Sequence, residues 1–217
     1  MDYNTLKQRH RDVRDGYPLN LNLRIHRALS WWQRALQADD VDGRFIFLWI
    51  AFNAAYATEI DEQYRLSEQA TFQAFLEKLC AMDHSKQIDT LVWQEFSSTI
   101  RILLDTPYVL QSFWDWQRKK ITAEEWKKRL DQGKQQASYA LANGNTAGLL
   151  SIIFSRLYTL RNQLMHGGAT WNSFVNRSQL RDCTKLLDKL VPVIISLMLE
   201  NPNTLWGDAC YPVVETT

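Results

Sequence analysis

Residues 44–57 read RFIFLWIAFNAAYA, and this stretch decides the fold class. Apolar side chains occupy nearly every position of its helical wheel, and Asn53 is the one strongly polar residue within it after Arg44 at its start. A helix that is apolar all round is buried on every face, so we expect this one at the centre of a helical bundle. It is shorter than the roughly 20 apolar residues that span a bilayer.

The sequence on both sides of this stretch is also typical of helices. Glycine and proline are sparse, with 8 and 5 among 217 residues, and strand-like alternation is hard to find. A capping box at Thr122-Ala-Glu-Glu125 predicts a helix that begins at Ala123. Helical spacing of apolar residues recurs in the windows 21–38, 69–82, 87–104, 149–166 and 178–200. We therefore predict an all-α bundle.

The predicted helices are assigned to a single domain over residues 1–217, an antiparallel bundle with additional helices inserted in its middle. Its parts are a core at 21–104 and 146–200, a helical elaboration at 107–140, and a C-terminal tail at 201–217. The Gln, Ser, Asn and Gly content of residues 131–148 favours a flexible connection before the closing helices.

Charge and cysteine content exclude several classes of protein. With 25 basic and 24 acidic residues the net charge is +1, so any RNA contact should be local rather than a broad basic surface. The three cysteines are widely spaced and form no CxxC pair, which argues against a disulfide framework or a zinc site: Cys80, Cys183 and Cys210. Because the N-terminus is polar, we expect a cytoplasmic protein without a membrane segment.

The candidate catalytic residues lie at the C-terminal end of the helix predicted over 149–166. Its last turn reads Arg161-Asn162-Gln163-Leu164-Met165-His166, and Gly167-Gly168 supplies a C-terminal cap. A helical wheel gathers a core face of Leu149, Ile153, Leu157, Leu160 and Leu164. The opposite, outward face holds Ser151, Ser155, Tyr158, Asn162 and His166. Arg161 flanks this polar face, and its long side chain can swing toward His166.

Histidine and arginine together form a minimal set for phosphodiester cleavage. A histidine exchanges protons near neutral pH, so His166 can act as a general base or acid. The forked donors of Arg161 suit a phosphate oxygen and the charge that builds up during phosphoryl transfer.

Arg161-Asn162-x-x-x-His166, late in a helical chain, resembles the Arg-x(4 to 6)-His signature of HEPN domains, in which a polar residue often follows the arginine. The segment 48–56, LWIAFNAAY, is similar to the buried second helix of larger HEPN proteins, including the abortive-infection group. The resemblance covers chiefly residues 21–60 and 146–200. It implies a HEPN-like bundle with Arg161, Asn162 and His166 as catalytic residues.

The same resemblance implies a metal-independent endoribonuclease that needs no cofactor. Its substrate would be RNA, cleaved by attack of the 2′-OH to leave a 2′,3′-cyclic phosphate, and DNA would be inert because it lacks that hydroxyl. A homodimer would build one composite site from two Arg161 and two His166 side chains. Toxin-type growth arrest or antiviral defence, and a possible antitoxin or regulatory protein, follow from the resemblance alone.

Other interpretations of these residues stay open. A noncatalytic HEPN-like dimeric module that binds nucleotide, RNA or a partner protein would use the same surface without turnover, and a helical scaffold would use none of it. Asn53 either satisfies buried backbone groups or approaches the motif. Tyr158 and Ser155 either line a dimer contact or support the substrate.

Further polar and aromatic groups are interpreted as structural. His10, His26 and His84 lack ligand spacing, so surface or structural roles are expected in place of a metal site. The tryptophans of the elaboration, Trp114, Trp116 and Trp126, are expected to pack in a core in preference to stacking on bases.

Overall fold

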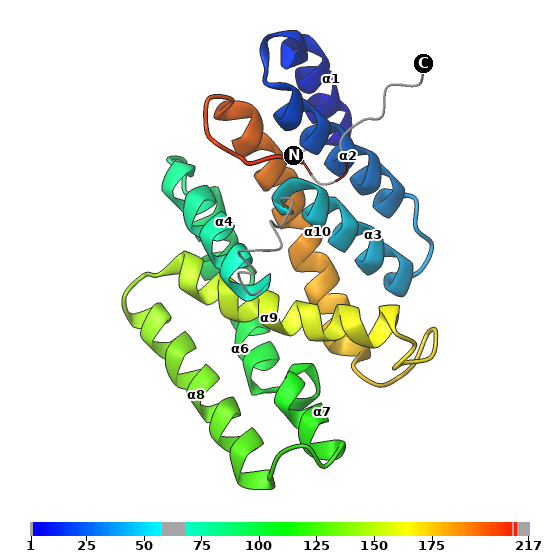
Figure 1. Cartoon of the computed structure of the whole chain (residues 1–217), viewed down its shortest axis with the longest axis vertical. Coiled ribbons are helices and arrows are strands. Elements are labelled where there is room, and N and C mark those ends of the chain that lie inside the picture. Colours follow the sequence, from blue (N-terminus) through cyan, green and yellow to red (C-terminus); the bar gives the residue numbers. More distant parts are fainter. Residues whose placement is uncertain (1, 58–67, 210, 212–217) are drawn as a thin grey trace. The chain divides into compact units, whose positions relative to one another are not determined.

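The computed structural model describes residues 2–57, 68–209 and 211, and it is all-helical, as predicted (Figure 1). Its contacts divide the chain into two compact units. The first comprises Met1–Thr71 and Leu187–Thr217, and the second comprises Phe72–Leu186. The assignment of the whole chain to a single domain stays a prediction.

The first unit is organised around the apolar stretch that decides the fold class. Its helices are α1 (Tyr3–Val13), α2 (Leu19–Leu36), α3 (Val41–Tyr56) and the later part of α10 (Arg177–Glu200). Helix α3 packs along α2, and its side chains Phe45, Leu48 and Phe52 are fully buried. Helix α3 therefore lies at the centre of this unit, as predicted for the apolar stretch.

Polar contacts fix the position of α3 within the first unit. The Asp40 side chain accepts a hydrogen bond of 2.8 Å from the backbone N–H of Gly43 and caps the start of the helix. The half-buried guanidinium of Arg44 donates two hydrogen bonds, of 2.8 and 3.0 Å, to the Asp188 carboxylate on α10. A bidentate pair of this kind also fixes the rotation of α3 against α10.

Helix α1 is absent from the sequence predictions because its stretch is mostly polar. It buries only Leu6 and His10, which stand four residues apart and so share one face. Burial lowers the pKa of His10, whose ring Nε2 lies 3.3 Å from Asn22 Oδ1. His10 is thus a packed structural residue, as expected.

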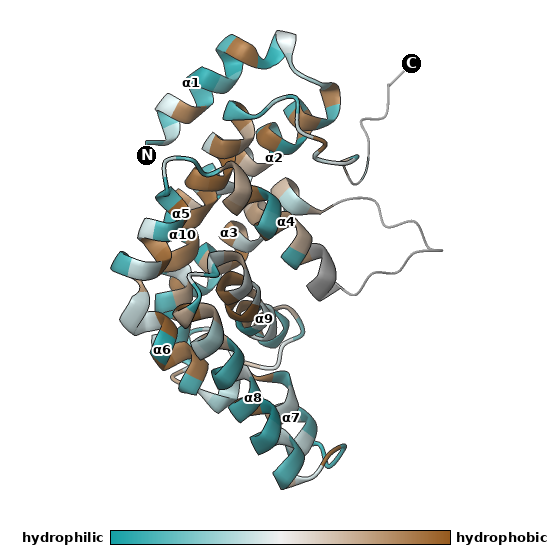
Figure 2. Ribbon diagram, turned by 90° about the vertical axis from the view of Figure 1, so that its left-hand side faces the viewer, coloured by the Kyte–Doolittle hydropathy of each residue, from teal (hydrophilic) through white to brown (hydrophobic). Residues whose placement is uncertain are grey.

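The second unit is built around helix α9 (Thr146–Met165). The other helices are α4 (Glu68–Met82), α5 (Gln87–Thr90), α6 (Ser97–Asp105), α7 (Gln111–Gln117) and α8 (Ala123–Ala142), together with the start of α10. The first three turns of α9 are buried, with Leu150, Ile153 and Phe154 fully enclosed. Helix α8 packs on α7 and α9 and is largely hydrophilic (Figure 2), since only Ala137 and Ala140 of its residues are buried.

The prediction of a single helix over 87–104 is wrong, because this segment forms three separate helical elements. Helix α5 passes into a π-helical turn (Leu91–Glu95), and α6 starts only after Phe96 leaves helical geometry. In the wider turn the indole N–H of Trp93 donates a hydrogen bond of 2.9 Å to the Thr146 hydroxyl at the start of α9. Periodicity cannot reveal such a tertiary contact, whereas π turns commonly accompany one.

The flexible connection predicted over 131–148 is also wrong. Helix α8 continues to Ala142, and only a short turn around Gly144, whose φ is 61°, separates it from α9. Gln, Lys and Ala are good helix formers, so the polar composition of this segment does not prevent a helix. The predicted start is confirmed, since the Thr122 hydroxyl and the Glu125 carboxylate each accept a hydrogen bond from the other residue's backbone N–H.

The tryptophans of the elaboration pack together, as expected. Their rings surround Phe113, with centroid distances of 5.4 Å to Trp114, 5.6 Å to Trp116 and 5.4 Å to Trp126. These contacts form a small aromatic core between α7 and α8.

The cysteines and the termini complete the fold. Cys80 and Cys183 carry free thiols, and burial raises the pKa of the Cys80 thiol to about 12. Cys210 and residues 212–217 of the predicted tail lie outside the described residues, as do residues 58–67 of the predicted core. No helix in the described part of the chain has the length and hydropathy needed to cross a bilayer.

Candidate functional site

The motif-bearing helix α9 ends where the sequence predicts. His166 follows the last helical residue, and Gly167 adopts the left-handed conformation with φ of 66°. The backbone N–H of Gly167 donates to the Leu164 carbonyl at 3.3 Å, and that of Ala169 donates to the Gln163 carbonyl at 3.1 Å. These bonds close the end of the helix, and glycine tolerates the left-handed conformation that they need.

His166 is exposed at this helix end. Its backbone N–H donates to the Asn162 carbonyl at 3.1 Å, while its imidazole has no hydrogen bond, ion pair or ring contact with any described residue. Both ring nitrogens are therefore open to a ligand, which is what a proton-transfer group requires.

The Arg161 guanidinium is held against its own helix. Its Nη1 donates a hydrogen bond of 2.9 Å to Asn162 Oδ1, and its Cζ lies 5.7 Å from the centroid of the Tyr158 ring. The Tyr158 ring in turn makes an edge contact with Phe72, at a centroid distance of 6.3 Å. The guanidinium thus has a defined position, although its buried Nε finds no hydrogen-bond partner in the described structure.

The structure brings only some of the predicted site residues together. Arg161, Asn162 and Tyr158 form one cluster, and no contact joins His166 to the Arg161 side chain within the described protomer. Ser155 is half-buried, and its backbone carbonyl accepts a hydrogen bond from the Thr159 hydroxyl.

The predicted outward face of α9 is wrong over its first part. Ser151 is only 6% exposed, and two polar residues that the wheel left unassigned, Arg156 and Thr159, are also buried. Because α9 is enclosed by neighbouring helices over its first three turns, its polar residues there are enclosed as well. Ser155 and Tyr158 are half-buried, and the first exposed residue of the helix is Met165.

Asn53 belongs to the first unit, in helix α3. Its Oδ1 is buried and has no hydrogen-bond partner among the residues that the structure describes, so the expectation that it satisfies buried backbone groups through this atom is not met. An approach of Asn53 to the motif stays a prediction.

Gln163 is a site residue that sequence reasoning missed. Its side-chain Nε2 donates to the Tyr108 carbonyl at 2.8 Å, and its Oε1 accepts from Asn176 Nδ2 at 3.0 Å. Gln163 therefore links the end of α9 to two segments that are distant in sequence. Nothing in the local pattern reveals this role, because both partners depend on the tertiary fold.

Large apolar side chains are exposed next to the motif. Their exposed fractions are 50% for Met165, 73% for Trp171, 98% for Phe174 and 62% for Val175. Met165 ends α9 and the other three lie in the loop that follows, so four large apolar side chains are exposed within eleven positions.

The charge around the motif is one-sided. Residues 132–181 contain five lysines and arginines and neither an aspartate nor a glutamate. On α10, Arg181 and Lys185 are both exposed and stand one helical turn apart. Two of the five basic residues do not add to an exposed positive surface, since Arg156 is buried and Lys134 is paired with Asp105. The acid-free stretch is visible in the sequence itself, but the net charge of +1 conceals it.

The described residues contain no group of three or more His, Cys, Asp or Glu side chains placed to hold a metal ion. In comparisons with protein-family models, curated proteins and solved structures, the chain matches none of them.

Proposed function

We propose that this protein is a metal-independent endoribonuclease of the HEPN class, with His166, Arg161 and Asn162 at its site. The observation that carries the proposal is the exposed His166 imidazole, which has no hydrogen bond, ion pair or ring contact among the described residues. His166 follows Arg161 by five residues, and the Arg161 guanidinium is held by Asn162 and Tyr158. A helix cap that served only structure would not need an exposed histidine near an arginine.

The chemistry follows from these two groups. One His166 imidazole takes the proton from a ribose 2′-OH, and the resulting oxygen attacks the adjacent phosphorus. The bond from phosphorus to the 5′-oxygen breaks, and that oxygen takes a proton from a second imidazole or from water. The products are a 2′,3′-cyclic phosphate and a 5′-OH, while Arg161 stabilises the charge on the phosphoryl oxygens.

A homodimer completes this site in the proposal. Within one protomer the Arg161 side chain contacts Tyr158 and Asn162, which precede His166 on the helix, and has no contact with His166 itself. A second copy docked on the motif supplies another imidazole and another guanidinium. The exposed Met165, Trp171 and Phe174 provide the apolar surface that such docking would bury.

One observation favours the noncatalytic alternative. Arg161 Nε is buried, and Nη1 is already bonded to Asn162, so part of the guanidinium serves the protein itself. A dimeric module that binds nucleotide, RNA or a partner protein would not need the whole guanidinium to be open to a substrate. The remaining biological assignments are also proposals: a cytoplasmic protein of toxin-type or antiviral defence, with a possible antitoxin or regulatory partner.

The nuclease is tested by its dependence on the 2′-OH. We expect the purified protein to cleave a labelled single-stranded RNA in EDTA and to leave cyclic phosphate ends, while the same sequence made of DNA or of 2′-O-methyl RNA stays intact. The methylated strand controls for binding, because it retains the bases and phosphates. Cleavage of DNA, or ends carrying a 3′-OH, would contradict the proposed chemistry, and failure to cleave any RNA would favour the binding module.

A further inference from the structure

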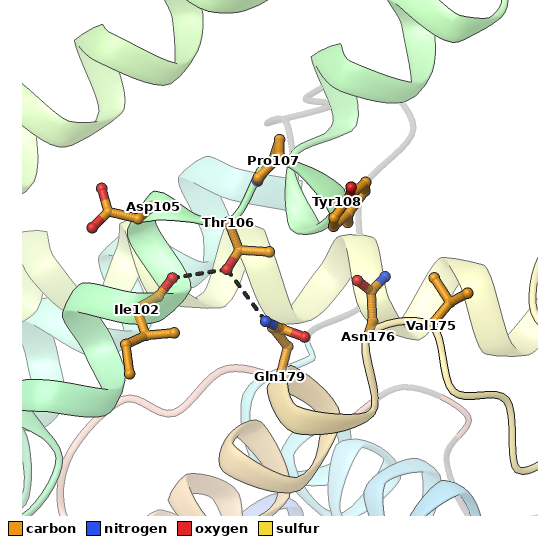
Figure 3. A pocket seen from close by; sticks show the side chains of 8 residues that line it. All are labelled: Ile102, Asp105, Thr106, Pro107, Tyr108, Val175, Asn176 and Gln179. Atoms are coloured by element: carbon orange, nitrogen blue, oxygen red, sulfur yellow. Dashed lines mark hydrogen bonds between the residues drawn. The ribbon is translucent and has the colours of Figure 1, made fainter.

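An open pocket lies in the second unit beside the last turn of α9 (Figure 3). It is walled by the end of α6, by the 3₁₀ turn at Pro107–Val109, and by residues 175–179 at the start of α10. Its volume is about 540 Å³. Sites for small molecules occupy about 300 to 1,000 Å³, so the pocket is large enough for a planar ring system.

Gln163, three residues before His166, connects this pocket to the last turn of α9. Its side chain is hydrogen-bonded to the Tyr108 carbonyl on one wall and to the Asn176 amide on another. Gln163 lies between Asn162 and His166 in the last turn of α9. Both walls are therefore held in place by a residue of the motif itself.

The apolar part of the lining forms a slot with an aromatic wall. The Tyr108 ring is 46% exposed and is held by an edge-to-face contact with Phe113, at 5.2 Å and 86°. Pro107 and the exposed Val175 add apolar surface. A preformed aromatic face of this kind suits stacking of a flat ring, because the side chain loses little freedom on binding.

The polar side chains that line the pocket are uncharged, apart from an aspartate that is paired with a lysine. Side chains of Thr106, Asn176 and Gln179 converge on the pocket, and the Thr106 hydroxyl accepts from Gln179 Nε2 at 3.4 Å (Figure 3). The Asp105 carboxylate is paired with Lys134 at 2.8 Å. Among the residues that the structure describes, no lysine or arginine lines the pocket, so it suits an uncharged ligand with N–H donors better than a free phosphate.

Asn176 adds a second sign of a binding site. Its Oδ1 is buried without a hydrogen-bond partner in the described part of the chain. An unsatisfied buried acceptor costs free energy and tends to persist where a ligand uses it.

We infer that this pocket holds one unpaired nucleobase of the RNA, next to the phosphate that reaches Arg161 and His166. The inference rests on the proposed function, since it names the substrate feature that the same site selects. Stacking on Tyr108 and hydrogen bonds to the polar lining require a base turned out of any helix, so the protein selects single-stranded RNA over duplex RNA.

Binding of a strand that cannot be cleaved tests the pocket separately from the chemistry. Fluorescence anisotropy is measured with a labelled single-stranded 2′-O-methyl RNA for wild type, Tyr108→Ala and Gln179→Ala. The matched control is Tyr139→Ala, which removes a tyrosine that is 70% exposed on α8 and lies outside the pocket. We expect Tyr108→Ala to weaken binding about tenfold, Gln179→Ala to weaken it less, and the control to bind like wild type.

The outcomes separate the pocket from the nuclease. If the variants bind as expected while wild type cleaves no RNA, the binding of a nucleobase in the pocket is supported and the nuclease proposal is contradicted. Unchanged binding by both pocket variants would overturn the pocket, even if RNA is cleaved. It would equally be overturned if Tyr108→Ala reduced self-association in sedimentation and left RNA binding intact, because the surface would then dock protein.

Discussion

Replacing His166 by alanine is expected to slow RNA cleavage by about 10² to 10⁴-fold, the usual contribution of a general acid or base. The imidazole is exposed and makes no hydrogen bond, ion pair or ring contact with other described residues, so its loss should leave the thermal unfolding midpoint unchanged. Loss of activity without loss of stability distinguishes a chemical role from a structural one. The measurement is the single-turnover cleavage rate in EDTA, together with a melting curve of each variant.

His84→Ala is the matched control for this prediction, since His84 is also exposed and lies in the second unit, between α4 and α5. We expect it to cleave like wild type. Arg161→Ala should lose about 10² to 10³-fold, as expected for removal of one group that stabilises the transition state. Equal rates for wild type and His166→Ala would place the activity elsewhere or in a contaminating nuclease.

Replacing Arg24 by methionine is expected to cost about 3 kcal/mol in the free energy of unfolding, because each buried acceptor left without a donor costs about 1 to 3 kcal/mol. Arg24 is 1% exposed, and its guanidinium donates to the carbonyls of Ala55, Asp208 and Gly207 at 2.8, 2.7 and 3.3 Å. Ala55 lies in the last turn of α3, where carbonyls have no partner within the helix. Methionine keeps the apolar stem but leaves these carbonyls without their donor.

Arg156 provides the contrasting measurement, because it is equally buried but has no hydrogen bond or ion pair to any described residue. Burial lowers the pKa of the Arg156 guanidinium to about 10. A shift of this size corresponds to about 3 kcal/mol of lost stability. Arg156→Met should therefore raise the free energy of unfolding, and urea denaturation followed by circular dichroism measures both variants. A destabilised Arg156→Met protein would contradict this account.

The fold class could be predicted because it depends on local signals. The apolar stretch 44–57, the capping box at Thr122 and the Gly-Gly end of α9 each act within a few residues, and the structure confirms all three. The interruption of the helix at 91–95 could not be predicted, since it accompanies a hydrogen bond from Trp93 to a residue more than fifty positions away.

The candidate site was only partly predictable for the same reason. The order of Arg161, Asn162 and His166 and the helix end are local, and they lie where the sequence places them. The burial of Ser151 depends on helices that enclose α9, and a helical wheel of one helix contains no information about its neighbours. The role of Gln163 likewise depends on Tyr108 and Asn176, which the fold brings to it.

The composite site is tested most directly by mixing two inactive variants. His166→Ala and Arg161→Ala proteins carry different affinity tags, are allowed to exchange subunits, and the mixed dimers are isolated through both tags. Each mixed dimer retains one His166 and one Arg161 from different copies, so the account predicts cleavage well above that of either parent. Mixed dimers that form but stay as inactive as their parents, beside an active wild type, would contradict a site shared between two copies.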